Sequence, residues 1–342
     1  MLKIFGKNPS GSLLQKIKHS PNYKSKAFQN LLPTPMILKG ISSFDLLRKF
    51  LNKPSDTKPP KRLPSEKHNL KNLDGDSPTI IWFGHSSYFI RINQKNILID
   101  PVFSGNASPL PFMIKAFNGS DIYDVDDFPQ IDYLIITHDH YDHLDYRTIK
   151  KLKPKVTSVY CPLGVSSHLA LWGFEVNIIN ELDWWQSKMT ADDIELTAAP
   201  ARHFSGRSFD RCKTLWTSFI LKTKTYKLYL GGDSGYGEHF KKVGKDFGPF
   251  DIAILEAGQY NAAWPLIHMM PEQTVQAAID LRADALMPVH WGKFSLALHP
   301  WQEPIERVLK EAAIKQLKVT TPMIGEPVIL HQSYPSKEWW NF

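Results

Sequence analysis

A six-residue run, His138-Asp139-His140-Tyr141-Asp142-His143 (the His-rich run), constrains this chain more than any other feature. It follows directly on Leu134-Ile135-Ile136-Thr137, a sequence typical of a buried strand. Because side chains alternate along extended backbone, the first two histidines point the same way, and the final Asp-His pair can approach a second position. Imidazole suits zinc, and an added carboxylate suits a divalent ion. With 13 histidines in 342 residues, three within six positions are not expected by chance, so the run predicts a metal-binding loop.

The His-rich run cannot complete a two-metal site alone, because a catalytic zinc takes about four ligands, one of them water. Three further candidates are His203, Asp233 and His290. Each follows an apolar, strand-like run at the point where it meets a small or polar turn, which is where site residues often lie. Taken alone, each is equally well explained as a hydrogen-bonded edge residue or a turn former. Their joint appearance after the His-rich run predicts the missing ligands.

These motifs together resemble the metallo-β-lactamase fold superfamily over roughly residues 77–310. The segments that carry the resemblance are Ile97-Leu98-Ile99-Asp100-Pro101, Thr137 to Asp145 (THDHYDHLD), His203, Gly232-Asp233-Ser234 and Val289-His290-Trp291-Gly292. The resemblance implies a metal-dependent enzyme in which Asp100 steadies the metal site from behind, holding a ligand imidazole in one tautomer.

A narrower likeness concerns the branch that contains N-acyl phosphatidylethanolamine phospholipase D and its bacterial relatives. It is carried by Trp82–Ile90 (WFGHSSYFI), Gly231–Asp251, His268–Ala277 and His290–Trp301. The likeness implies two zinc ions per chain, with iron or manganese left open as alternatives. By that likeness one zinc takes His138, His140 and His203, the other takes Asp142, His143 and His290, and Asp233 bridges them.

The same likeness implies that Asp142 and His268 take part in catalysis, with His268 facing the substrate. His268 is equally well explained as a residue at the start of a helix. Weaker candidates for substrate binding are His85, Arg207 and His299. A guanidinium matches phosphate geometry, which favours Arg207, although a surface loop charge explains it equally well.

The order of strand-like and helix-like segments predicts an α/β fold, a four-layer αββα sandwich of two sheets with helices outside. Thr79 to Ile92 is expected as a strand that returns through 97–99 as a hairpin. Further strands are expected at 132–137, 156–160, 174–179, 194–199, 214–223, 226–230, 251–255 and 285–289. Helices are expected at 43–52, 146–152, 272–281 (after Pro271) and 304–313.

Basic residues are concentrated at the start of the chain. Residues 1–75 hold 15 Lys/Arg and 4 Asp/Glu, whereas the remainder holds 26 and 30. We therefore expect a basic N-terminal extension over 1–76, including a Pro/Lys-rich linker at 53–68, and a hydrolase domain over 77–342. Such an extension suits contact with an anionic membrane surface or nucleic acid, or is only a solvated segment.

We expect a binuclear hydrolase that uses a metal-bridging hydroxide, acting as a phosphodiesterase of the phospholipase D type on N-acyl phosphatidylethanolamine or a related lipid. The alternative is a carbonyl-centred, lactonase-like hydrolase on the same metal pair. A nuclease ranks lower, because the body is slightly acidic. With two cysteines and no long apolar stretch, the expected location is the cytoplasm, and peripheral membrane contact and a homodimer are left open.

Overall fold

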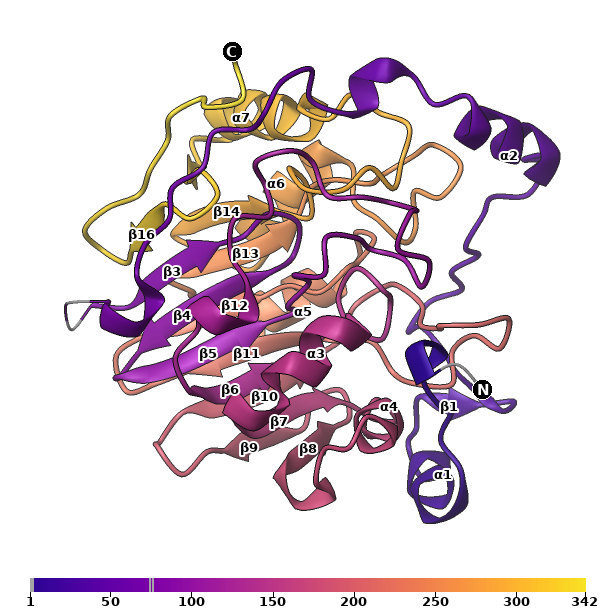
Figure 1. Ribbon diagram of the computed structural model, residues 1–342. Coiled ribbons are helices and arrows are strands. Elements are labelled where there is room, and N and C mark those ends of the chain that lie inside the picture. The colour runs from indigo at the N-terminus through magenta and orange to yellow at the C-terminus, as the bar shows by residue number, and fades with distance from the viewer. Residues whose placement is uncertain (1–2, 74, 76) are drawn as a thin grey trace.

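Two seven-stranded sheets lie face to face in the computed structural model, which describes residues 3–73, 75 and 77–342 (Figure 1). The first sheet contains, in spatial order, β16 (Pro327–Ile329), β3 (Thr79–Trp82), β4 (Tyr88–Ile92), β5 (Lys95–Ile99), β6 (Ile131–Ile135), β7 (Val156–Pro162) and β8 (Ile179–Leu182). The second contains β15 (Lys318–Val319), β14 (Ala285–Val289), β13 (Ile252–Glu256), β12 (Lys227–Leu230), β11 (Ser218–Lys222), β10 (Glu195–Ala199) and β9 (Ser187–Met189).

Helices cover the outer face of each sheet. α3 (Tyr146–Leu152) and α4 (Ser166–Leu171) pack on the first sheet, and α5 (His239–Asp246), α6 (Pro271–Asp280) and α7 (Glu303–Lys315) pack on the second. Short 3-10 helices are η4 (Val125–Asp127), η5 (Lys153–Lys155) and η6 (Val176–Ile178). Strand residues alternate between layers: Ile80 and Ile90 enter the core between the sheets, whereas Ile81 and Phe89 pack under the helices. The predicted four-layer αββα sandwich is thereby confirmed.

Strand direction places the site. β5 to β8 run parallel in one sheet, and β12 to β15 run parallel in the other. The carboxyl ends of parallel strands meet at one edge of a sheet, where open α/β proteins form their binding crevices. Asp100 follows β5, the His-rich run follows β6, Asp233 follows β12, and His290 follows β14. Residues far apart in the sequence are therefore gathered at one edge.

Most expected elements are present with shifted ends, and two are wrong. The expected strand from Thr79 to Ile92 is two strands, because Gly84 and His85 have positive φ and turn the chain between β3 and β4. The strand expected at 174–179 is mainly the 3-10 helix η6, with the strand starting at Ile179. Among the described residues, no helix is both long and apolar enough to cross a bilayer.

The segment before the first large-sheet strand is packed against the body rather than extended from it (the N-terminal segment, residues 3–73). It contains η1 (Lys3–Phe5), α1 (Gly11–Lys18), the hairpin of β1 (Tyr23–Lys24) and β2 (Ala27–Phe28), α2 (Ser43–Leu51), η2 (Ser55–Thr57) and η3 (Leu70–Asn72). Ile17 and Phe28 are buried against Trp216, and Leu63 lies in the main core. The Pro/Lys-rich segment 53–68, expected as a linker, therefore contributes Leu63 to the core. Asp76, the last residue of the expected extension, lies outside the described residues.

Candidate metal centre

A buried carboxylate fixes the His-rich run against the neighbouring strand. Ile99 of β5 lies opposite Ile135 of β6, so Asp100 lies beside the residues that follow β6. Its carboxylate accepts hydrogen bonds from the Thr137 amide at 2.8 Å and the Thr137 hydroxyl at 2.6 Å. It also lies 2.7 Å from Nδ1 of His143. Asp100 thus contacts Thr137, just before the run, and His143 at its end, and the other ring nitrogen of His143, Nε2, lies near Asp142 and Asp233.

The first group of possible ligands contains His138, His140, His203 and Asp233. Nε2 of His138 lies 2.9 Å from Nδ1 of His140, and Nε2 of His203 lies 3.3 Å from that same Nδ1. Asp233 Oδ2 lies 3.8 Å from Nε2 of both His138 and His203. Nδ1 of His203 donates to the Ile267 carbonyl at 2.8 Å, which leaves its Nε2 for a cation.

The second group contains Asp142, His143 and His290, together with His85. Nε2 of His143 lies 3.5 Å from Asp142 Oδ2 and 3.2 Å from Asp233 Oδ2. Asp233 Oδ1 lies 3.2 Å from Nδ1 of His290. Asp233 therefore faces both groups, as a bridging ligand must. His85 donates from Nε2 to Asp142 Oδ2 at 2.9 Å, a contact with the site that the sequence suggested only weakly.

The chemistry of these residues fits two divalent cations. Among the described residues, Nε2 of His143, Nε2 of His290 and Oδ1 of Asp233 are buried without a hydrogen-bond partner. Burial holds the pKa of His138 well below its usual value, so its imidazole is neutral and suited to coordination. Burial opposes ionisation of Asp233, yet the surrounding imidazoles, His143 foremost, hold its pKa well below its usual value. His138 thus offers a neutral nitrogen and Asp233 an ionised carboxylate, whereas the pKa of His143 is raised despite burial by the carboxylates around it, Asp233 foremost.

Glu256 is a residue of the site that sequence reasoning missed. Its Oε2 lies 2.6 Å from Nδ1 of His268, and its Oε1 accepts from the Met269 amide at 2.8 Å. Burial raises the pKa of Glu256 to about 7. Burial opposes the charged form of His268, but Glu256 raises its pKa to about 9. The His268 ring centre lies 5.0 Å from that of His203, so this pair borders the first ligand group. The sequence did contain a signal for Glu256, because this residue ends an apolar strand at the same sheet edge as Asp233.

Two predicted substrate residues point elsewhere. Arg207 is buried and donates to the carbonyl oxygens of Ile4, Asp139 and Leu144, so its guanidinium is occupied by main chain. The expected phosphate contact by Arg207 is corrected accordingly: this side chain supports the His-rich run from behind. His299 accepts at Nε2 from the Gln259 amide at 2.9 Å, and its Nδ1 lies 2.8 Å from the Pro300 carbonyl. Both nitrogens of His299 are used locally, which is unsuited to substrate binding.

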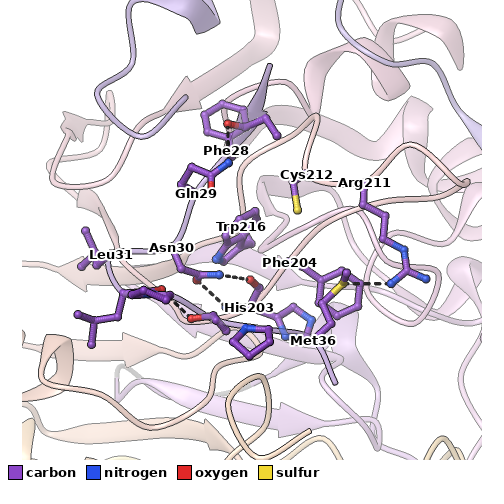
Figure 2. A pocket seen from close by; sticks show the side chains of 15 residues that line it. Phe28, Gln29, Asn30, Leu31, Met36, His203, Phe204, Arg211, Cys212 and Trp216 are labelled. Carbon is purple, nitrogen blue, oxygen red and sulfur yellow. Dashed lines mark hydrogen bonds between the residues drawn. The ribbon is translucent and has the colours of Figure 1, made fainter. Parts of the chain in front are cut away.

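The N-terminal segment holds the site from two sides. The Asn30 side chain donates to the His203 carbonyl at 2.7 Å and accepts from the His203 amide at 3.1 Å (Figure 2). Behind the His-rich run, the Lys7 amide donates to Nδ1 of His168, whose Nε2 lies 3.1 Å from Asp139 Oδ2. Residues expected to lie outside the domain therefore position a ligand.

An open cavity of about 540 Å³ begins at His203. Residues 27–36 form one wall, and Phe204, Arg211, Cys212 and Trp216 line the remainder (Figure 2). The side chains that line it are largely apolar, and its volume lies within the range of small-molecule sites. The cavity thus places a mainly apolar lining beside His203, one member of the first ligand group.

Comparison with known proteins identifies the family. The family described as "Beta-lactamase superfamily domain" matches residues 95–291, more than half of the chain. The chain belongs to the metallo-β-lactamase superfamily. An uncharacterised protein of Mycobacterium tuberculosis is 38% identical over 329 residues, spanning 95% of this chain and 88% of that protein. The match therefore includes most of the N-terminal segment.

Two further comparisons concern a curated relative and a solved structure that shares the fold. The N-acyl-phosphatidylethanolamine-hydrolyzing phospholipase D 1 of Caenorhabditis elegans is 29% identical over 285 residues, spanning 76% of this chain and 78% of that protein. The solved structure of Igni18, a metallo hydrolase from Ignicoccus hospitalis, matches with a TM-score of 0.58 at 20% identity, covering 75% of this chain and 100% of that one. The superfamily member described here is a metal-dependent hydrolase with candidate metal-binding His/Asp clusters.

Proposed function

We propose that this protein is a zinc-dependent phosphodiesterase that cleaves N-acyl phosphatidylethanolamine, or a related phospholipid, in the manner of a phospholipase D. The proposal is carried by the position of Asp233 between two groups of ligands, and a cavity with a mixed, mainly apolar lining borders His203 of the first group. The cavity suits an acyl chain, and the ligand groups suit a phosphate diester. The likeness to the Caenorhabditis elegans phospholipase supports the same substrate class.

Two divalent ions held by the predicted ligands would supply Lewis acidity and a water-derived nucleophile at neutral pH. Imidazoles with carboxylates favour zinc, and iron or manganese remain alternatives. The chain's own residues have separate tasks. Asp233 and Asp142 hold the site together, and Asp100 fixes the orientation of His143.

His268 is the proposed proton donor. During hydrolysis a P–O bond to water oxygen forms, the P–O bond to the leaving alcohol breaks, and the alcohol oxygen takes up a proton. The imidazolium of His268, held by Glu256 beside the first ligand group, can give that proton from Nε2. Phosphatidic acid and an N-acyl ethanolamine would then be the products.

Two cavities beside residues 30–32 favour a lipid over a small polar diester. Leu31 and Leu32, which line the first cavity, also line a second cavity of about 310 Å³ together with Trp185. The chain at 30–32 thus separates two partly apolar cavities. Two such spaces on either side of one segment suit a substrate with more than one acyl chain.

Purified, zinc-loaded protein should release phosphatidic acid from vesicles that contain N-acyl phosphatidylethanolamine, and His268→Ala should reduce that release. Comparing bis(p-nitrophenyl) phosphate with a panel of lactones separates the lactonase-like alternative. Preferential turnover of lactones, with no phosphatidic acid released, would contradict the proposal. Metal analysis of the protein as isolated identifies the bound ion.

A further inference from the structure

Three neighbouring strands of the second sheet end in possible metal ligands. β12, β13 and β14 run parallel and lie side by side (Figure 1). Asp233 follows β12, Glu256 ends β13, and His290 follows β14. The carboxyl ends of parallel strands meet at one edge of a sheet, so these three side chains are gathered there. Two of them belong to the candidate metal centre, and Glu256, on the strand between them, does not.

Glu256 belongs to a third group of possible ligands, which also contains Asp233, His268 and His290. Each residue offers one nitrogen or oxygen atom, and these atoms all lie within 4.8 Å of one another, as they do in the first and second groups. Bonds from zinc to such atoms are about 2.0–2.2 Å long, so two ligands of one ion are at most roughly 4.4 Å apart. The atoms of the third group are therefore close to the spacing that one ion requires.

The third group has donor atoms that the first two groups do not need. Oδ2 of Asp233 lies 3.8 Å from Nε2 of His203, in the first group, and 3.2 Å from Nε2 of His143, in the second. This one oxygen therefore faces both groups. Among the described residues, Oδ1 of Asp233 is buried without a hydrogen-bond partner. Glu256 and His268 belong to neither of the first two groups, so they and Oδ1 of Asp233 are available to a further cation.

The burial and charge of the third group favour a divalent cation. The carboxylate side chains of Glu256 and Asp233 are only 1% and 3% exposed. Buried charges in proteins are paired or coordinate metals, and one divalent ion can be shared by two carboxylates. Imidazole together with carboxylate oxygen suits zinc, iron or manganese. The side chain of His268 is 12% exposed, so solvent, and a cation with it, reaches the group at this residue.

We propose that Glu256, His268 and Oδ1 of Asp233 form a third, inhibitory site for a divalent cation. Divalent ions repel one another at short distance, so this site fills last and only when metal is in excess. A cation bound there would take the carboxylate that holds His268 in place as a proton donor. Excess metal should therefore inhibit the enzyme. The site itself is independent of the substrate, whereas its inhibitory effect rests on the proposed function.

Zinc content tests the site without turnover. The zinc-loaded full chain is dialysed against buffers of increasing free zinc, and the bound zinc per chain is measured. Glu256→Gln and His268→Ala each remove one ligand of the third site, so each should bind one zinc fewer than wild type at the highest concentration. The control Glu272→Gln, a carboxylate paired with Arg307 on the outer helices, should bind as much as wild type. Zinc on surface histidines is equal in these proteins and cancels in the comparison.

Hydrolysis of bis(p-nitrophenyl) phosphate is measured in wild type at the same zinc concentrations. It should fall by about 100-fold as the last zinc binds, the lower end of what a general acid contributes. Equal zinc content in wild type and both variants would overturn the third site, and full activity with the site filled would overturn its inhibitory effect. If one variant loses all its zinc through misfolding, the other variant decides. A zinc lost in both variants, in a protein that hydrolyses no diester, would reject the proposed function and leave the site intact.

Discussion

The Glu256 carboxylate lies 2.6 Å from Nδ1 of His268, in a buried contact beside the first ligand group. This contact binds a proton on His268 that burial alone would remove. The pKa of His268 is raised to about 9, and that of Glu256 to about 7, so the charged pair predominates between these values. The pair therefore keeps an acid available at the pH at which a metal-activated water is a base.

This contact predicts a pH dependence. His268 loses its proton as the pH rises through about 9, so turnover that needs the imidazolium should fall above that pH. Glu256→Gln removes the charge that raises the pKa of His268, and the alkaline limb of the kcat–pH profile should move down by about one unit or more. Glu272→Gln, which alters a carboxylate paired with Arg307 on the outer helices, is the matched control. An unchanged alkaline limb in Glu256→Gln would contradict the proton-donor role.

The bridging position of Asp233 predicts loss of metal. Its Oδ2 lies 3.8 Å from Nε2 of His138 and of His203 in the first group. Its Oδ1 lies 3.2 Å from Nδ1 of His290 in the second group, so Asp233→Ala removes the charge common to both groups. Bound zinc should fall from near two per chain, and diester hydrolysis should be abolished. Metal analysis after desalting checks the stoichiometry, with the surface variant Asp246→Ala as control. Zinc content near two in Asp233→Ala would count against bridging.

Asn30 should affect metal affinity although it binds no metal. Its side chain holds the main chain of His203 by two hydrogen bonds, so Asn30→Ala frees a ligand that is otherwise fixed. Removing groups that orient ligands weakens metal affinity by about 10–100-fold, and we expect the lower end of that range. Titration of metal-free protein with zinc measures the change. Gln29→Ala, next to it but exposed, should titrate like wild type.

Arg207 should affect stability rather than substrate affinity. Arg207→Ala leaves buried carbonyl oxygens of Ile4, Asp139 and Leu144 without their donor. The free energy of unfolding should fall by about 3 kcal/mol, measured by denaturant titration against the exposed control Arg147→Ala. The KM of the folded Arg207→Lys variant for bis(p-nitrophenyl) phosphate should equal that of wild type. A raised KM would restore the phosphate-binding interpretation.

The layered fold and the gathering of the ligand candidates at one sheet edge could both be predicted from the sequence. Both follow from the local order of apolar strand-like runs and the polar residues that end them. A buried strand followed by His138 and His140 indicates metal binding, and parallel strands bring their carboxyl ends together at one edge of the sheet. Segment 174–179 failed for a physical reason: its apolar residues do not distinguish a strand from a 3-10 turn that precedes one.

Contacts between distant segments were beyond a single sequence. The residues around Asn30 do not indicate that its side chain binds the main chain of His203. The carbonyl oxygens that accept hydrogen bonds from Arg207 come near it only in the folded chain. Glu256 could have been predicted from the sequence, because it lies at the end of an apolar strand. The N-terminal segment was misjudged because its proline and lysine content suits a linker, while the side chains that anchor it, such as Leu63 and Leu70, are widely spaced.

Arg207 reaches the Ile4 carbonyl across 203 positions of sequence. The entropic cost of closing a loop grows with its length, so we expect this contact to form late, after the strands that carry the ligands have paired. Metal ions can then reach the ligands while residues 3–7 are still detached. When these residues dock, they close the back of the His-rich run. Docked residues 3–7 would slow the dissociation of bound metal, so that the protein would keep its ions by kinetic retention as well as by affinity.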